Sequence, residues 1–354
     1  MTTPAECGYA MPAEWAPHAG CWMIWPERPD NWRLGAKPAQ KAFTEIATAI
    51  SRFEPVTMLV SHHQYANARA MLPPGIRVLE MSSNDAWARD ICCTFLLGPQ
   101  GALGGVDWRF TSWGGLYFPW DKDDALAAKV LEIERAHRFR APFVLEGGAI
   151  HVDGEGTILA VEQCVLNHNR NPGIERQDME RMLKAYLGAS HIIWIKNGVP
   201  HDETDGHVDN LACFVRPGVV LLTWCDDPAD PHYQVSREAE ATLRQARDAK
   251  GRALVIERIP MPTPMFYTDV EADGVDLSEN GMNRKAGERL PASYVNFYIA
   301  NGAIIAPAFG TETDAPARIV LTRLFPDRDI VMIPAREILL GGGNIHCITQ
   351  QQPR

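Results

Sequence analysis

The sequence predicts an α/β protein that forms one domain over residues 1–354 and is built from repeated units of strand, hairpin and helix. Three observations support this prediction. Amphipathic helices alternate with short β-rich runs along the chain, hairpin turns lie between these units, and no low-complexity linker divides the sequence. The unit recurs about five times with negligible sequence identity between copies, so we interpret the repeat as structural.

Five segments have the apolar spacing of amphipathic helices. They are residues 38–53, 124–138, 175–187, 236–250 and 314–325. Pro38 suits a first helical turn, Gly188 is a typical C-terminal stop, and Ser236 is a favourable N-cap. The apolar stripes predict core-facing surfaces.

A short β-rich run follows each helix, at residues 56–60, 143–145, 191–196, 253–259 and 329–333. Hairpin strands are predicted at residues 157–161, 211–216 with 219–224, and 294–299 with 303–306. The last pair flanks Asn301-Gly302, which is a strong hairpin signal. A further run at 76–81 precedes Asp90. If the repeats surround an axis, equivalent strand ends converge, and residues far apart in sequence form one site.

Composition and charge exclude several classes of protein. Hydrophobic residues make up 46% and charged residues 22% of the chain, as in ordinary globular proteins. No apolar run approaches the roughly 20 residues of a membrane helix, and the N-terminal residues show no secretory signal. The net charge of −10 disfavours nucleic acid and anionic membrane as partners and is compatible with a cationic substrate. With eight cysteines and no CxxC pair, we expect reduced thiols and a cytoplasmic location.

A glycine-rich segment precedes a cysteine near the end of the sequence. Residues 341–347 read GGGNIHC. Three glycines allow close backbone approach, so Cys347 could be held at the wall of a pocket. A buried structural thiol is the alternative, and the sequence alone leaves both open. A phosphate-binding loop is disfavoured, because no Lys-Ser/Thr follows the glycines.

Residues 202–210, DETDGHVDN, place four acids around one histidine. A His-x-Asp pair on a strand faces one side, so His207 and Asp209 could act together in proton transfer. A solvated acidic loop and a salt-bridged histidine are alternatives. A metallohydrolase site of His207, Asp209 and Asp205 is a further alternative. Activity that survives a strong chelator would exclude it.

Two further carboxylates follow predicted strands. Glu146 comes directly after the run 143–145, and we expect it to be half buried with a histidine or a cationic ligand as its partner. Asp90 lies beside Arg89, which makes a structural ion pair the simplest alternative. Trp87 could cover the apolar stem of a ligand, or it could be a core tryptophan. Together, a cysteine, a histidine and several carboxylates match a planar guanidinium, which two carboxylates grip and which lowers the pKa of an adjacent thiol.

The chain resembles the agmatine deiminases, which are guanidine-modifying enzymes of the bacterial-type peptidylarginine deiminase family. The matching stretches span nearly the whole sequence: MPAEWAPHAGCWMIWPERPDNWR, SWGGLYFPWDKDD, VLEGGAIHVDGEGT, NHNRNP, DETDGHVDN, RKAGERLPASYVNFYIANG and GGGNIHCITQQQP. The resemblance implies a five-bladed α/β propeller with pseudo-fivefold symmetry and a central site. It also implies hydrolysis of agmatine to N-carbamoylputrescine and ammonia in putrescine synthesis, with no metal or organic cofactor, in a homodimer or larger homo-oligomer.

The resemblance assigns roles residue by residue. Cys347 resembles the nucleophile, His207 the general acid/base and Glu146 its orienting partner. Asp90 and Asp209 resemble the guanidinium-binding carboxylates, and Trp87 and Glu203 match positions in the substrate pocket. In one place the sequence departs from the pattern: residues 91–93 are Ile-Cys-Cys where the family usually has Thr-Gly-Pro. We expect this change to alter the backbone beyond Asp90 and to bear on substrate preference.

Other functions remain open from sequence. The enzyme could act on arginine or peptidyl-arginine, but the matching stretches show no obvious basic partner for the α-carboxylate of arginine, which favours agmatine. The protein could instead bind polyamines or guanidines without catalysis, with Cys347 inert. A papain-like protease is disfavoured because its cysteine precedes its histidine in the chain. The long, turn-rich segment 260–289 could be a lid or a subunit contact.

Overall fold

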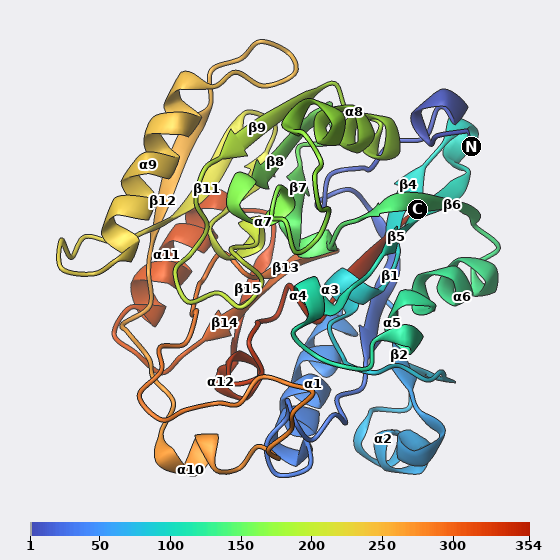
Figure 1. Ribbon diagram of the computed structural model, residues 1–354, viewed down its shortest axis with the longest axis vertical. Coiled ribbons are helices and arrows are strands. Elements are labelled where there is room, and N and C mark those ends of the chain that lie inside the picture. Colours follow the sequence, from blue (N-terminus) through green and yellow to red (C-terminus); the bar gives the residue numbers. More distant parts are fainter. Residues whose placement is uncertain (1) are drawn as a thin grey trace.

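In the computed structural model, which describes residues 2–354, five small β-sheets follow one another around the middle of the molecule (Figure 1). Four of them have three strands and share one design, in which an antiparallel hairpin is joined by a third, parallel strand. The strands are β4 (Thr94–Leu97), β5 (Leu103–Arg109) and β6 (His137–Val144); β7 (Ile150–Val152), β8 (Thr157–Val161) and β9 (His191–Ile195); β10 (Ala212–Arg216), β11 (Val219–Trp224) and β12 (Val255–Pro260); and β13 (Tyr298–Ala300), β14 (Ala303–Ala308) and β15 (Asp329–Pro334).

The two ends of the chain build the remaining sheet together. Its strand order is β16-β1-β2-β3, with β1 at His18–Ile24, β2 at Val56–Val60, β3 at Arg77–Glu80 and β16 at Gln350–Pro353. The C-terminal strand β16 pairs antiparallel with β1 and takes the place of a hairpin partner. The ring of sheets is therefore closed by the residues that follow Cys347.

One long helix connects the second and third strands of each sheet and lies at the outside of the ring (Figure 1). These helices are α1 (Lys37–Ile50), α6 (Leu126–Ile133), α8 (Arg176–Leu187), α9 (His232–Gln245) and α11 (Asp314–Leu324). Because helices cover one face and neighbouring blades the other, central strands such as β2, β8 and β11 are buried along their whole length. The predicted five-bladed α/β propeller with pseudo-fivefold symmetry is thereby confirmed.

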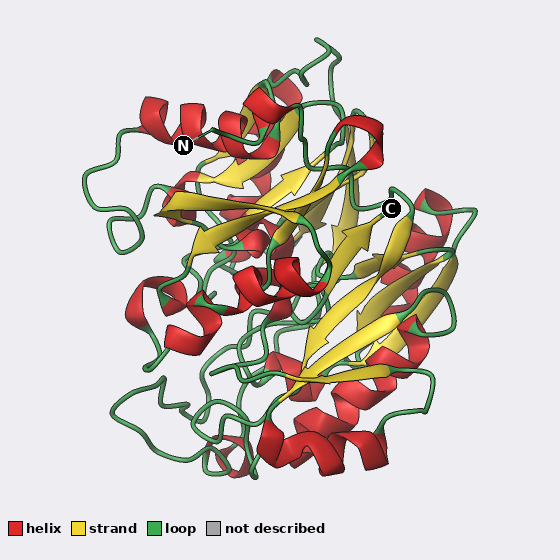
Figure 2. Cartoon of the chain, turned by 90° about the vertical axis from the view of Figure 1, so that its right-hand side faces the viewer, coloured by secondary structure: helices red, strands yellow, loops and turns green. Residues whose placement is uncertain are grey.

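Short helical segments fill the connections. They are α2 (Tyr65–Met71), α3 (Ala88–Ile91), α4 (Ser112–Gly115), α5 (Asp121–Asp124), α7 (Glu162–Val165), α10 (Asp269–Ala272) and α12 (Arg336–Leu339), with 3₁₀ turns η1 (Ala5–Cys7), η2 (His62–Gln64), η3 (Pro99–Gly101), η4 (Gly147–Ala149) and η5 (Val208–Asn210). In the view turned by 90° (Figure 2), loops gather at the end of the molecule where Figure 1 shows α10. In the described part of the chain, no helix has the length and apolar character needed to cross a bilayer.

Two predicted helices have the wrong ends. The helix expected at 124–138 stops at Ile133, and Arg138 already lies in β6, where it contacts the buried Asp107 of β5. The helix expected at 236–250 covers His232–Gln245 instead. It begins early because the Asp230 carboxylate accepts the His232 N–H at 2.9 Å, and the residues after it form a turn around Asp248. Tertiary ion pairs and side-chain caps decided both ends, which periodicity alone does not reveal.

The remaining predicted elements differ from the structure by a few residues. The strand expected at 143–145 is the end of β6, and the one expected at 294–299 begins only at Tyr298. The hairpin at Asn301-Gly302 is confirmed as β13–β14. The Asn301 side chain also binds both backbone groups of His18, which links this sheet to the one the chain ends complete.

Candidate active site

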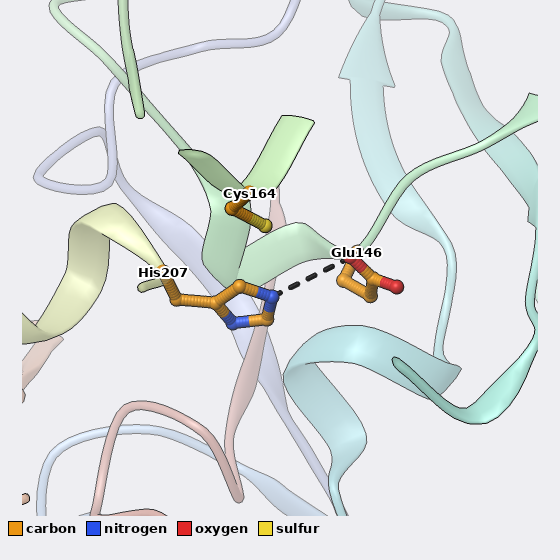
Figure 3. Close-up of side chains that lie close together, drawn as sticks. All are labelled: Glu146, Cys164 and His207. Atoms are coloured by element: carbon orange, nitrogen blue, oxygen red, sulfur yellow. Dashed lines mark hydrogen bonds and ion pairs between the residues drawn. The ribbon is translucent and has the colours of Figure 1, made fainter. Parts of the chain in front are cut away.

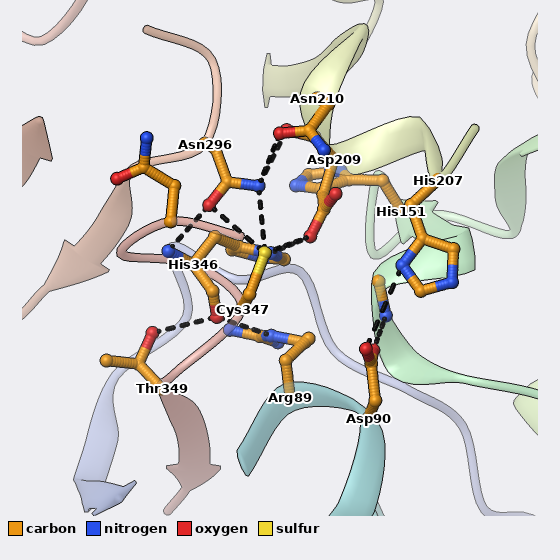
Figure 4. Close-up of polar contacts among 12 residues, drawn as sticks. Arg89, Asp90, His151, His207, Asp209, Asn210, Asn296, His346, Cys347 and Thr349 are labelled. Atoms are coloured by element: carbon orange, nitrogen blue, oxygen red, sulfur yellow. Dashed lines mark hydrogen bonds and ion pairs between the residues drawn. The ribbon is translucent and has the colours of Figure 1, made fainter. Parts of the chain in front are cut away.

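A short turn precedes the first strand of every sheet, and the predicted functional residues lie on these turns. Asp90 is on α3 before β4, Glu146 directly precedes η4 and β7, and His207 and Asp209 are at η5 before β10. Cys347 lies three residues before β16. Because the sheets are arranged around one axis, the turns meet at its centre (Figure 4). Asp90 was expected in a loop and the His-x-Asp pair on a strand; both lie instead on single turns of helix.

The Cys347 sulfur lies between an acid and an amide. Its Sγ is 3.5 Å from Asp209 Oδ2 and 3.2 Å from Asn296 Nδ2 (Figure 4). Burial, together with the charges of Asp209 and Asp90, raises the pKa of the thiol well above its usual range. The resting sulfur is therefore protonated, and a cation placed beside it would favour the thiolate.

The two aspartates beside the sulfur have opposite electrostatic surroundings. Asp90 accepts the Trp113 indole N–H and the Gly148 backbone N–H, both at 2.9 Å. Burial raises the pKa of Asp90, with Asp209 and Glu146 adding to the rise. For Asp209, burial is outweighed by a hydrogen bond from His346 Nδ1 at 3.0 Å, so its pKa is lowered. Its other oxygen, Oδ1, is buried without a hydrogen-bond partner in the described residues 2–354 and is free for a ligand.

The imidazole of His207 lies between two carboxylates. Its Nε2 is 3.5 Å from Glu146 Oε2, and its Nδ1 is 3.9 Å from Asp90 Oδ2. Burial alone would lower the pKa of His207, but the charge of Asp90 and the contact with Glu146 raise it well above its usual range. Arg170 donates to Glu146 at 3.1 Å and keeps the pKa of that carboxyl low despite its burial. These contacts favour the protonated imidazolium, the form in which a histidine can act as a general acid. Glu146 itself is buried, not half buried as expected.

Gly148 shows that these groups face one small space. A Cβ on this residue would lie 2.5 Å from His207 Nδ1, 2.9 Å from Asp209 Oδ2 and 3.1 Å from Asp90 Oδ1. Any side chain there would displace the imidazole or the carboxylates. The second glycine of LEGGA is thus required by the site rather than by backbone torsion.

A second thiol lies beside the imidazole. Cys164 of α7 is close to both Glu146 and His207, with one ligand atom of each within 4.8 Å of the others (Figure 3). These residues could hold a metal ion by type and spacing. However, the Arg170 guanidinium already pairs with Glu146, and its positive charge opposes a second cation at this point. Asp205 also pairs with Arg170, so the predicted metal set of His207, Asp209 and Asp205 is not brought together.

A pocket of about 320 Å³ opens onto the sulfur. Its lining includes four of the predicted site residues, and the full set is Trp87, Asp90, Trp113, Leu116, Tyr117, Glu203, Thr204, Gly341, Gly342, Gly343 and Cys347. The Trp87 ring stacks on Trp32 with centroids 4.9 Å apart. A Cβ on Gly343 would lie 2.5 Å from the Trp87 ring, so the glycine-rich segment lets the backbone pass close to this wall.

The far end of the pocket carries a carboxylate. Glu203 accepts a hydrogen bond from Tyr117 Oη at 3.3 Å and pairs with the guanidinium of Arg284. Arg284 belongs to one of the matching stretches, so the expectation that these hold no obvious basic group near the substrate is wrong. Its two Nη atoms are nonetheless occupied by Glu203, Asn31 and the Gly341 carbonyl, whereas its Nε is buried without a hydrogen-bond partner among the described residues.

Behind the sulfur lies a buried polar network that the sequence did not predict. His346 Nε2 contacts Glu14 at 3.0 Å, and Arg89 Nη1 contacts the same carboxylate at 3.3 Å. Burial opposes the ionisation of Glu14, but the charges of His346, Arg89 and His151 hold its pKa well below the usual range. Arg89 therefore pairs with Glu14 and not with its neighbour Asp90, contrary to the simplest alternative from sequence.

The other residues missed from sequence gave weak signals. Arg170 belongs to the matching stretch NHNRNP, His346 is the neighbour of Cys347, and Asn296 belongs to RKAGERLPASYVNFYIANG. Nothing in their spacing says that Arg170 supports Glu146 or that His346 supports Asp209, since the first contact joins two loops of one blade and the second joins two different blades. Cys92 and Cys93 are buried behind Asp90 with their sulfurs 4.0 Å apart. All eight cysteines are free thiols.

Comparisons with known proteins show the family to which this chain belongs. The family model of the Porphyromonas-type peptidyl-arginine deiminases matches residues 10–353. An agmatine deiminase of Pseudomonas aeruginosa (strain LESB58) is 57% identical over 99% of this chain and 97% of that protein. The solved agmatine deiminase of Enterococcus faecalis is 44% identical, with a TM-score of 0.97 over 100% of this chain and 98% of that one. A C. jejuni agmatine deiminase solved with substrate bound is 25% identical, with a TM-score of 0.85 over 98% of this chain and 96% of that chain.

A five-bladed α/β propeller with a cysteine, an imidazole and paired carboxylates at its centre defines a guanidine-modifying hydrolase. The chain belongs to the agmatine deiminases within the Porphyromonas-type peptidyl-arginine deiminase family.

Proposed function

We propose that the protein hydrolyses agmatine to N-carbamoylputrescine and ammonia through a covalent amidino-cysteine intermediate, in the synthesis of putrescine. The observation that carries this proposal is the position of the Cys347 sulfur, 3.5 Å from Asp209 and at the end of a pocket that Asp90 also lines. Two carboxylates can hold the plane of a guanidinium. Its central carbon is then presented to the sulfur, which makes the attack effectively intramolecular.

Binding of the cation is the first step of the proposed reaction. The guanidinium takes the free Oδ1 of Asp209 and the carboxylate of Asp90. Its positive charge offsets the aspartates that raise the pKa of Cys347, and the thiol proton passes to solvent. The thiolate then attacks the central guanidinium carbon and forms a C–S bond. No metal or organic cofactor is needed, because the substrate itself supplies the activating charge.

Breakdown of the adduct requires an acid. The His207 imidazolium gives its proton to one nitrogen, the C–N bond breaks, and ammonia leaves, so that a thiouronium remains on Cys347. Neutral His207 next takes a proton from water as the oxygen attacks the same carbon. The C–S bond then breaks, the thiolate leaves and takes up a proton from solvent to restore the thiol, and the hydroxyl proton of the product passes to solvent, where it converts the released ammonia to ammonium. Glu146 keeps His207 charged between cycles, and its own position is fixed by Arg170.

The far end of the pocket supports agmatine over arginine. Glu203 offers a carboxylate to the terminal ammonium of agmatine. Arginine would also bring an α-carboxylate to this point, and the charge of Arg284, the basic group seen there, is taken up by Glu203. Trp87 and Trp113 line the pocket between the two ends and suit the apolar stem of a polyamine.

A substrate panel tests the proposal. Agmatine, arginine and a peptidyl-arginine are incubated with the enzyme, and the ureido product and released ammonia are measured. We expect kcat/KM for agmatine to be at least about 100-fold higher than for arginine or the peptidyl-arginine. Both of these substrates carry groups that have no matching partner at the Glu203 end of the pocket. Faster turnover of arginine would favour the arginine deiminase alternative. Binding of agmatine without ammonia release would favour a non-catalytic guanidine-binding protein.

A further inference from the structure

The fifth turn around the axis carries a residue with no role in the scheme above. Asp90, Glu146, the pair His207 and Asp209, and Cys347 come from the turns before β4, β7, β10 and β16. The equivalent turn before β13 carries Asn296, which is fully buried. We propose that the Asn296 amide is a catalytic residue that directs an N–H at the Cys347 sulfur and stabilises its thiolate.

A chain of amides fixes the orientation of this side chain. The Asp202 carboxylate accepts the Asn210 Nδ2–H at 3.0 Å, which turns Asn210 Oδ1 toward Asn296. Asn296 Nδ2 donates to that oxygen at 3.0 Å, and its own Oδ1 accepts the His346 backbone N–H at 2.9 Å. The oxygen and nitrogen of Asn296 are thereby assigned from both sides. Flipping the Asn296 amide would place its oxygen against Asn210 Oδ1 and its NH₂ group against the His346 N–H.

This orientation leaves one amide hydrogen for the sulfur. Nδ2 carries two hydrogens, and one is used by Asn210 Oδ1. The other has two acceptors in reach, Cys347 Sγ at 3.2 Å and, slightly farther, the Asp209 backbone carbonyl at 3.4 Å (Figure 4). A carboxamide donates to a thiolate but not usefully to a protonated thiol, which can donate its own hydrogen to Asp209 Oδ2. The contact is therefore strongest when the sulfur is charged, both as nucleophile and as leaving group in the second step.

The electrostatics of the site make such a donor necessary. The charged neighbours of the sulfur, Asp209 and Asp90, oppose its ionisation, and the Asn296 amide counters them. A positively charged side chain at this point would compete with the guanidinium for the same carboxylates. A neutral donor avoids that competition.

The experiment measures the reactivity of the sulfur without substrate. Enzyme is treated with iodoacetamide over a range of pH, and carboxamidomethylation of the Cys347 peptide is followed by mass spectrometry. Asn296→Asp keeps the acceptor for the His346 N–H but replaces the donor with an oxygen. We expect its alkylation rate at a given pH to fall about 10- to 100-fold, the effect of losing a hydrogen bond to a charged group. Asn296→Ala should show a loss of similar size.

A matched asparagine separates this role from a structural one. Asn301→Ala removes the contacts to His18 on the far side of the same blade, and we expect it to lower the melting temperature without slowing alkylation of Cys347. Asn296→Asp also brings a new carboxylate beside the sulfur, so the neutral Asn296→Ala is the deciding variant. Alkylation of Asn296→Ala at the wild-type rate would overturn the inference. If Asn296→Ala does not fold, the neutral Asn296→Leu, which fills the space but has no donor, decides in its place.

The inference rests on the proposed function for its place in catalysis, but the two can fail separately. Alkylation reports on the sulfur even if agmatine is not the substrate. With agmatine, both Asn296 variants should lower kcat about 10- to 100-fold while KM stays within about twofold, because the amide touches the sulfur and not the guanidinium carboxylates. A wild-type enzyme that ignores agmatine would refute the function. Turnover and alkylation unaffected by either variant would refute the role of Asn296.

Discussion

The thiol half of the site, around Cys347, and its imidazole half, around His207, use buried carboxylates to opposite effect. Beside Cys347, Asp209 and Asp90 raise the pKa of the thiol and keep it protonated. Beside His207, Asp90 and Glu146 raise the pKa of the imidazole and keep it protonated as well. Protonation makes a thiol a poor nucleophile, whereas it gives an imidazole the proton that it needs to act as an acid.

In the proposed mechanism, this difference means that the resting enzyme is prepared for only one of its two tasks. The imidazolium is ready to act as the acid before substrate binds, whereas the thiol becomes a nucleophile only when a positive charge lies between the aspartates. Because thiolates and not thiols react with oxidants, this arrangement also protects Cys347 between turnovers. A neutral analogue of the substrate would fit the pocket without activating the sulfur.

The largest effect is expected from the nucleophile itself. Cys347→Ser should lower kcat by at least about 10⁴-fold while leaving the fold intact, since the hydroxyl is not ionised by a neighbouring cation. Steady-state ammonia release and circular dichroism measure the two quantities. Cys7→Ser, in η1 and outside the pocket lining, serves as the control and should retain wild-type activity. Activity of Cys347→Ser above one hundredth of the control would contradict a covalent route.

The two aspartates come next. Asp90→Asn and Asp209→Asn should each lower kcat/KM by about 10²- to 10³-fold, because each leaves guanidinium donors without a charged partner. The pKa of Asp90 is raised and that of Asp209 lowered, so acidification protonates Asp90 first. The loss of kcat/KM caused by Asp90→Asn should therefore become smaller as the pH falls, whereas the loss caused by Asp209→Asn should not. Equal pH dependence in both variants would remove the distinction drawn between them.

A smaller effect is expected in the imidazole half. Glu146→Gln removes a negative charge beside His207, so the pKa of the imidazole falls and its protonated form is lost at lower pH. The alkaline limb of the kcat profile should move to lower pH, and kcat should fall about 100-fold. Glu162→Gln on α7, whose carboxylate pairs with Arg176, is the matched control. An alkaline limb unchanged in Glu146→Gln would mean that another group sets it.

The smallest effect is expected at the far end of the pocket. Glu203→Gln should raise KM for agmatine about tenfold with kcat nearly unchanged, because the carboxylate binds the terminal ammonium equally in ground and transition states. The ratio of agmatine to arginine turnover should fall in the same variant. A lower kcat at constant KM would place Glu203 in the chemistry instead.

The repeat and the candidate catalytic groups could be predicted from the sequence because local patterns mark both. Helical spacing marks α1 and α8, Asn301-Gly302 marks a hairpin, and GGGNIHC marks a cysteine at a close backbone approach. The end of α6 at 133 and the start of α9 at 232 were missed because an ion pair between strands and a hydrogen bond from the His232 N–H to the Asp230 carboxylate lie at these points. That residues 1–354 form one domain, and that the protein is cytoplasmic and forms a homodimer or larger assembly, stay predictions. The suggestion that segment 260–289 is a lid or subunit contact is also untested.

The supporting groups could not be predicted, since their contacts join segments that only the folded chain brings together. Arg170 reaches Glu146 from a segment 24 residues away in the same blade, and His346 reaches Glu14 over 332 residues where the two chain ends share a sheet. Asn296 is seen as part of the site only when the fifth turn is superposed on the other four by the symmetry of the ring. The types of these supporting residues follow no periodic pattern in the sequence. Which side chains meet is therefore decided only when the ring of sheets closes.

Mass spectrometry of acid-quenched enzyme during turnover tests the central claim most directly. With agmatine present, the account predicts an amidino adduct on the peptide that contains Cys347, absent from the Cys347→Ser variant. An adduct on the Cys92–Cys93 peptide, or active turnover with no adduct on any cysteine, would contradict it.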